Sequence, residues 1–181
     1  LRQYLESNDF VCSVRVTNGV GDAERWSQTA FESGFETIVI IGGDGSVGEV
    51  VAGQARSSNK VPVAIVPVGT ANVVAIALAL PLFPGMIKSN ILEGPVLSFD
   101  VGYVPAVDRH FLLMAAIGYP AKVIKDSPRK LKNLFGVFTY LWAGIRNAFK
   151  LDEIDISIED QKGGVRNFSG NTILLTNIGK I

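Results

Sequence analysis

The fold of this chain is decided by residues 37–51, TIVIIGGDGSVGEVV. The run Thr37–Ile41 is short, apolar and rich in β-branched residues, which is typical of a strand buried on both faces. Gly42–Gly45 follows as a glycine-rich loop. Ser46 and Glu49 then have the spacing of a capping box. The apolar face of the helix that follows consists of Val47, Val50 and Val51. The stretch therefore predicts a strand, a tight loop and a helix.

The same alternation extends to both sides of this stretch. Downstream, residues 63–66 predict a buried strand, residues 67–71 a loop, and Asn72 the start of a helix that ends before Pro81. Upstream, residues 11–16 alternate like a strand, and Asp22 is the predicted N-cap of a helix over 23–33. Strands that alternate with helices indicate a parallel sheet with crossover helices. We predict an α/β fold with a three-layer arrangement around a parallel sheet.

The pattern changes after Gly94. Residues 97–104 and 110–117 predict a hairpin, residues 131–149 a helix, and several short strands follow from Ile154 onward. We therefore expect an α/β domain over 1–96 and the beginning of an incomplete β-sandwich domain over 97–181.

Composition narrows the class of protein. The chain has 181 residues, 48% of them hydrophobic, with 17 basic and 17 acidic side chains, one Cys and one His. Such a chain is too apolar to be disordered, has no partner for a disulfide, and lacks the ligands of a zinc site. Neutral charge argues against a nucleic-acid partner. The uncharged run 61–87 contains four prolines, which argues against a transmembrane helix.

The glycine loop carries the strongest chemical signal. Bare N–H groups at the start of a helix can hold a phosphate. Gly43, Gly45 and Gly48 also fit the G-x-G-x-x-G dinucleotide fingerprint, but the next strand ends at Pro67 without the acid that would hold a ribose. A Walker A lysine is absent too. The carboxylate of Asp44 points instead to metal-assisted phosphoryl transfer, and its alternative role is that of a turn-forming residue.

A second loop, Pro67–Asn72, also follows a buried strand. Loops at the carboxyl ends of neighbouring parallel strands share one crevice, where ligands bind. Asp44 and Ser46 from the first loop, with Thr70 and Asn72 from the second, therefore form a candidate nucleotide site.

The two motifs G-G-D-G-S-x-x-E-V and P-x-G-T-A-N, in this order, resemble the diacylglycerol kinase catalytic-domain family, which includes bacterial diacylglycerol kinases, sphingosine kinases and ceramide kinases. Thr17 ahead of Gly21-Asp22-Ala23, the step at 100–102 and residues 111–119 also fall in family order. Ser46 replaces the usual Thr, and Gly48 stands where many members have Asn. Val73 replaces the Asp that follows the asparagine in many bacterial members.

The resemblance implies a cytoplasmic kinase that uses ATP and Mg²⁺ to phosphorylate a lipid hydroxyl, such as that of diacylglycerol. It allows a homodimer and peripheral contact with the inner membrane face. The basic residues of 122–150 and the aromatic residues of 131–149 are candidates for that contact. Their alternative roles are a solvated helix face for the basic residues and core packing for the aromatic ones. It assigns phosphoryl-transfer or metal support to Asp44 and leaves the metal ligands unknown. The implied nucleotide contacts are Thr17, Gly42, Gly43, Asp44, Gly45, Ser46, Val47, Gly48 and Thr70.

The resemblance also implies that a first strand would precede Leu1 and that the acidic general base and the residues organising Mg²⁺ would follow Ile181. The chain by itself is therefore expected to bind nucleotide weakly, if at all, and to show no turnover. Three alternatives remain open at this point: an NAD kinase, a Rossmann-type dinucleotide enzyme, and a non-catalytic lipid or nucleotide sensor.

Overall fold

The computed structural model describes residues 1–118, 153–159, 162–170 and 172–177, and it divides into two compact units. The first unit contains residues 1–113 together with Asn177, and the second contains the described residues between 114 and 176. The unit that holds the glycine loop thus extends beyond residue 96, where the sequence predicted its end. The predicted helix over 131–149 lies outside the described residues.

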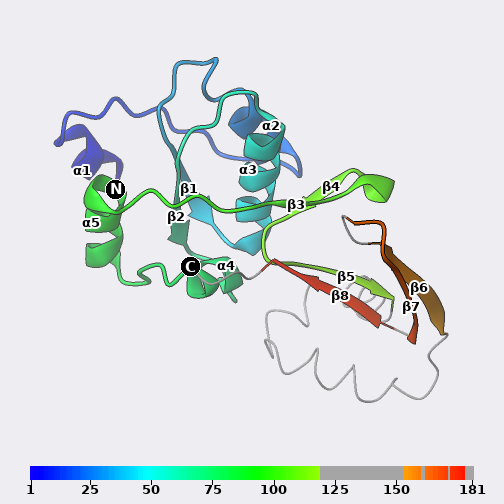
Figure 1. Cartoon of the computed structure of the whole chain (residues 1–181). Coiled ribbons are helices and arrows are strands. Elements are labelled where there is room, and N and C mark those ends of the chain that lie inside the picture. Colours follow the sequence, from blue (N-terminus) through cyan, green and yellow to red (C-terminus); the bar gives the residue numbers. More distant parts are fainter. Residues whose placement is uncertain (119–152, 160–161, 171, 178–181) are drawn as a thin grey trace. The chain divides into compact units, whose positions relative to one another are not determined.

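A parallel strand pair forms the centre of the first unit (Figure 1). Strand β1 (Ile38–Gly42) pairs with β2 (Val63–Pro67), in a register that places Ile40 opposite Ile65 and Gly42 opposite Pro67. Helix α3 (Asp44–Arg56) connects the two strands, as expected of a parallel crossover. The α/β class predicted from the sequence is confirmed.

The remaining helices of this unit are short. They are α1 (Arg2–Glu6), α2 (Asp22–Gln28), α4 (Val73–Ala77) and α5 (Pro84–Glu93). In Figure 1, α2 and α3 lie to one side of the strand pair and α1 and α5 to the other. The predicted helix from Asn72 to Pro81 is in fact α4 alone, because the chain turns at Leu78–Leu80.

The strand predicted over residues 11–16 is wrong. This segment has no ladder partner in the described part of the chain, and Val11, Val14 and Val16 are exposed. A strand exists only where a neighbouring backbone completes its hydrogen bonds, so alternation of apolar residues was insufficient. The Arg15 guanidinium lies over the rings of Trp26 and Phe35, at 5.7 and 5.8 Å.

The core of the first unit lies where α3 meets α4 and the strand pair. Val47, Val74 and Leu113 are its buried members. Val47 and Val50 are both buried, and Val51 packs against the core, so the apolar face predicted for α3 is confirmed. The partly buried residues around this core include Ile40, Ile65, Leu78, Phe99 and Leu112.

The hairpin predicted over 97–117 is only partly correct. Strand β3 (Gly102–Val104) pairs antiparallel with β4 (Arg109–Phe111) through a 3₁₀ turn, Pro105–Val107. The Phe111 ring covers Gly102, its cross-strand neighbour, where a Cβ would overlap the ring. The rest of the predicted second strand belongs to a separate element, because the chain bends at Leu112–Leu113 and buries Leu113 in the core.

The described residues of the second unit form two antiparallel strand pairs. Strand β5 (Met114–Gly118) pairs antiparallel with β8 (Thr172–Thr176), and β6 (Ile154–Glu159) pairs antiparallel with β7 (Val165–Gly170). The β6–β7 pair turns through Gly163, whose φ of 79° suits glycine. Whether these pairs form a sandwich stays a prediction.

Candidate nucleotide-binding site

The first glycine loop is the link between β1 and α3. Gly42 is the last residue of β1 and is buried, and Gly43 is the N-cap of α3 with an extended backbone (φ −96°, ψ −174°). The capping box predicted from Ser46 and Glu49 is wrong, because the helix begins at Asp44, two residues earlier. The Glu49 carboxylate instead accepts a hydrogen bond from the Ala23 N–H at 3.3 Å, which joins α3 to α2.

The start of α3 presents free backbone donors. The first hydrogen bond of the helix runs from the Val47 N–H to the Gly43 carbonyl at 3.1 Å. The N–H groups of Asp44, Gly45 and Ser46 therefore have no acceptor within the helix. Together with the partial positive charge of the helix N-terminus, they form an arrangement that suits phosphate oxygens.

The second loop lies directly against the first, as the parallel order of the strands predicted. The Val68 N–H donates to the Gly42 carbonyl at 3.1 Å. A Cβ on Gly69 would lie 2.5 Å from the Gly43 Cα, well inside contact distance, so the close approach of the two backbones requires glycine at position 69.

Asn72 holds the second loop in shape. Its side chain accepts a hydrogen bond from the Gly69 N–H at 2.8 Å and donates one to the Gly69 carbonyl at 2.9 Å. The residue adopts a left-handed conformation (φ 48°), which asparagine tolerates better than most residues. Asn72 does occupy the N-cap position of α4, as predicted, but its side chain makes no capping bond to the helix. Its role is to clamp the glycine.

Asp44 connects the two loops through its carboxylate. Its Oδ1 accepts a hydrogen bond from the Val74 N–H, in the first turn of α4, at 3.0 Å. The negative charge is also favourable at the start of its own helix, α3. One carboxylate oxygen thus has a structural contact, which the sequence did not reveal. The role in phosphoryl transfer predicted for Asp44 stays a prediction.

The other predicted contacts divide into exposed and buried residues. Thr17, Gly45, Gly48 and Thr70 are exposed, and Ser46 is half-buried. Val47 differs: its side chain is 2% exposed and its N–H donates to Gly43. Neither group of Val47 is therefore available to a ligand, and its observed role is in the core.

Asp22 shapes the turn that follows Thr17. The sequence predicted it as a helix N-cap, but Gly21, with φ 89°, occupies that position. The Asp22 carboxylate instead accepts hydrogen bonds from the N–H groups of Asn18 at 2.8 Å and Gly19 at 3.0 Å. These two bonds, helped by Arg25, lower the pKa of Asp22 below its usual value.

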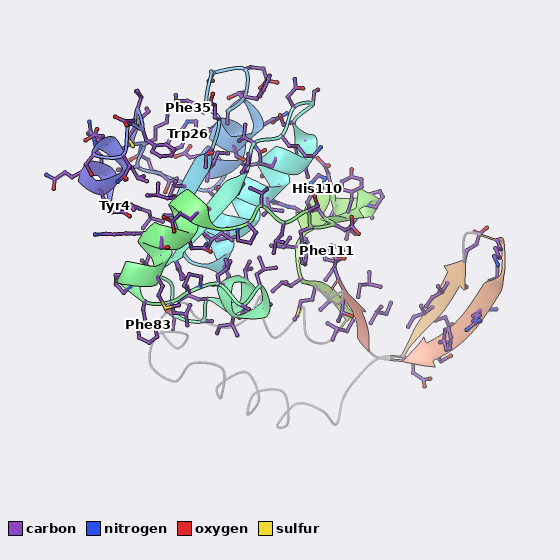
Figure 2. The ribbon with its side chains drawn as sticks, turned by 60° about the vertical axis from the view of Figure 1, so that its left-hand side comes forward. Tyr4, Trp26, Phe35, Phe83, His110 and Phe111 are labelled. Carbon is purple, nitrogen blue, oxygen red and sulfur yellow. The ribbon has the colours of Figure 1, made fainter. Side chains whose placement is uncertain are left out.

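A charged cluster on the same unit involves none of the predicted site residues. The Arg56 guanidinium contacts the carboxylates of Glu24 and Asp108, each at 3.0 Å, and the Tyr103 hydroxyl donates to Asp108 at 2.9 Å. The bonds from Arg56 and Tyr103 lower the pKa of Asp108, and the bond to Asp108 raises the pKa of Tyr103. His110, labelled in Figure 2, is half-buried, and its ring lies 4.8 Å from that of Tyr103 between centroids.

The described residues contain no group of three or more His, Cys, Asp or Glu side chains that could hold a metal ion. Among the helices formed by these residues, none has the length and apolar character required to cross a membrane.

Comparison with known proteins gives the family. The sequence profile of the diacylglycerol kinase catalytic domain matches residues 1–104. A protein named diacylglycerol kinase from Staphylococcus saprophyticus is 33% identical over 155 residues, which are 86% of this chain and 50% of that protein. A protein of the same name from Staphylococcus aureus strain JH9 is 31% identical over 170 residues, which are 94% of this chain and 52% of that protein.

A crystal structure of a diacylglycerol kinase from Bacillus anthracis superposes with a TM-score of 0.69 and 26% identity, covering 89% of this chain and 51% of that one. The chain spans about half the length of the curated relatives it matches. The family profile matches more than half of the residues. This match selects the diacylglycerol kinase family over the NAD kinases and Rossmann-type enzymes, which the glycine loop alone also allowed. The chain belongs to the diacylglycerol kinase catalytic-domain family.

Proposed function

We propose that this chain provides the nucleotide-binding part of a kinase that transfers the γ-phosphoryl group of ATP to a lipid hydroxyl. The relatives are named for diacylglycerol, which makes it the first acceptor to test. The observation that carries the proposal is the backbone contact between Gly43 and Gly69, because it brings the second loop against the start of α3.

The residues present fit the phosphates of ATP. The free N–H groups of Asp44, Gly45 and Ser46 would hold phosphate oxygens, and a Cβ placed on Gly45 would meet nothing within 4 Å, so the backbone there is open to a ligand. The hydroxyls of Thr17 and Thr70 are exposed and would add donors. Phosphoryl transfer requires mainly positioning and charge stabilisation, which such donors supply.

The residues also fit Mg²⁺. This ion usually takes one or two protein carboxylates and completes its shell with phosphate oxygens and water. One carboxylate oxygen of Asp44 accepts a hydrogen bond from the Val74 N–H, and the other would be available to the ion. When bound, Mg²⁺ neutralises charge on the phosphates. The part played by the chain is to hold that carboxylate beside the phosphate-binding donors.

Ligand-induced stabilisation tests the proposal. ATP with Mg²⁺ should raise the Tm of the chain in a thermal-shift assay, and NADH should not. Asp44→Asn keeps an oxygen that can accept from Val74, so the fold should survive while the Mg²⁺-dependent part of the shift is lost. The matched control is Asp9→Asn, at an exposed acid outside both loops. Equal shifts for Asp44→Asn and the unaltered chain would refute the assignment of Asp44.

The acceptor needs a separate experiment. Transfer of label from radiolabelled ATP to a panel of lipid alcohols, measured on the protein extended to the full length of its relatives, would identify it. ATP binding without transfer to any lipid would instead favour a nucleotide sensor.

A further inference from the structure

Three large apolar side chains are exposed where α4 leads into α5, two from the turn between the helices and one from the first turn of α5. Leu82 is 50% exposed, Phe83 73% and Met86 60%. We refer to these three residues as the apolar turn. Figure 2 shows Phe83 at the periphery of the first unit, with its side chain directed away from the helices. Apolar residues gathered on one exposed turn indicate an interaction surface, whereas single exposed apolar residues are ordinary.

The backbone holds this turn in place. The Leu80 N–H donates to the Ala75 carbonyl at 2.8 Å, which closes the end of α4. Pro81 and Pro84 fix the backbone on both sides of Leu82 and Phe83. Ile87, one turn into α5, is buried and donates its N–H to the Phe83 carbonyl at 3.0 Å. The apolar turn is therefore preorganised, and little conformational entropy would be lost when it binds.

The turn also lacks charges that binding would have to desolvate. No ionisable side chain occurs between Lys60 and Lys88. The Lys88 ammonium lies over the Tyr4 ring at 4.9 Å, where α5 faces α1. A neutral, apolar turn can enter the boundary between headgroups and acyl chains without the cost of burying a charge.

The size of the surface argues against a second copy of the chain as the partner. Three side chains of this size expose on the order of a few hundred Å², whereas a stable protein interface buries about 800 Å² on each partner. Binding to a bilayer requires no minimum area, because each apolar side chain that enters it contributes independently to the free energy of binding.

We propose that the apolar turn docks the protein on the surface of a lipid bilayer. The proposal rests on the proposed function, because a lipid acceptor resides in the bilayer and the enzyme must reach it. An open hollow of about 410 Å³ adjoins the turn, and Pro81 and Met86 belong to its wall. Its other lining residues are Ala79 and Gly94, together with the polar Ser89, Asn90 and Glu93. This mixed apolar and polar lining suits the boundary between headgroups and acyl chains.

Sedimentation with phosphatidylcholine vesicles tests the proposal on the whole chain. The unaltered chain should sediment with the vesicles, and Phe83→Ser should lower the partition coefficient about tenfold or more. Phe83 is the N-cap of α5, a position where serine is favoured, so this variant should fold at least as well. The matched control is Val14→Ser, which removes a 64% exposed apolar side chain from another segment and should change partitioning less than twofold.

A second measurement reports insertion directly. In Phe83→Trp, brominated phosphatidylcholine should quench the added indole fluorescence, measured as the difference from the unaltered chain. Absence of vesicle binding, an equal loss in Val14→Ser, or no added quenching would each overturn the proposal. So would a dimer that is detected by sedimentation equilibrium and abolished by Phe83→Ser without any vesicle binding. ATP plays no part in these assays, so failure of the kinase assignment would appear separately, in the thermal-shift experiment.

Discussion

Two glycines of α3 should respond in opposite directions to the same substitution. Gly48 and Gly53 both lie inside this helix, and alanine at either position gains helix propensity of about 0.5–1 kcal/mol. A Cβ on Gly48 would meet nothing within 4 Å. A Cβ on Gly53 would overlap the Glu24 carbonyl oxygen and come within 2.9 Å of the Ser27 Cβ, because α2 crosses α3 at this residue. Gly48→Ala is thus a matched control for Gly53→Ala.

The loss of stability in Gly53→Ala follows from the displacement of α2. The overlap involves backbone, so the helix itself must move, and overpacking of this kind costs about 1–3 kcal/mol. The movement also strains two buried hydrogen bonds, Ser27 Oγ to the Val50 carbonyl at 2.7 Å and Gln54 Nε2 to the Ser27 carbonyl at 2.6 Å. Each contributes about 0.5–1.5 kcal/mol. We expect Gly53→Ala to lower the free energy of unfolding by about 1–4 kcal/mol after the gain in propensity.

Urea denaturation followed by tryptophan fluorescence measures this difference, since Trp26 lies on α2. The urea midpoint should rise for Gly48→Ala and fall for Gly53→Ala. In thermal melts, the two variants should differ in Tm by roughly 3–20 °C, at about 2–4 °C for each kcal/mol in a chain of this size. Equal midpoints for the two variants would refute the close crossing of α2 and α3.

Three further outcomes are expected. Gly69→Ala should push its loop away from Gly43 and weaken ATP binding by about tenfold or more, measured by calorimetry; unchanged affinity would contradict a site formed by both loops. Asp22→Ala should accelerate hydrogen exchange at the backbone amides of Asn18 and Gly19, because both donate to the Asp22 carboxylate. Exchange at the unaltered rate would count against a role of Asp22 in holding this turn. Because Arg56 lowers the pKa of Asp108, this pair stabilises the fold above about pH 4, and the contribution is lost as pH falls through the folded pKa. Arg56→Met should therefore reduce the loss of Tm on acidification, and an unchanged pH dependence would exclude the pair as its source.

Local sequence patterns predicted much of the first unit. The β-branched run before Gly42 and the similar run before Pro67 form β1 and β2, because short apolar runs bounded by loops have few other stable arrangements. The helix between them follows from the spacing of Val47, Val50 and Val51. The proximity of the two loops in the candidate site was also predictable, because parallel strands bring their carboxyl ends together.

Errors occurred where the folded structure, rather than the spacing of the residues, selects the bonding partner. Residues 11–16 carry the alternation of a strand but have no neighbouring strand in the described part of the chain. Ser46 and Glu49 have capping-box spacing, yet Glu49 bonds to Ala23 on another helix. Asn72 looked like a helix cap and clamps Gly69 instead. Spacing identifies groups that are able to bond, but it does not select among partners.

The amino-acid sequence was sufficient to predict the α/β class, the two glycine loops and their order, and through those motifs the family. These features depend on local backbone preferences and on the topology of parallel strands. The contact between Gly43 and Gly69, the bond from Val74 to Asp44 and the exposure of Phe83 could be established only from the folded chain. Each of these depends on how segments distant along the chain pack together, and burial and close approach are properties of that packing.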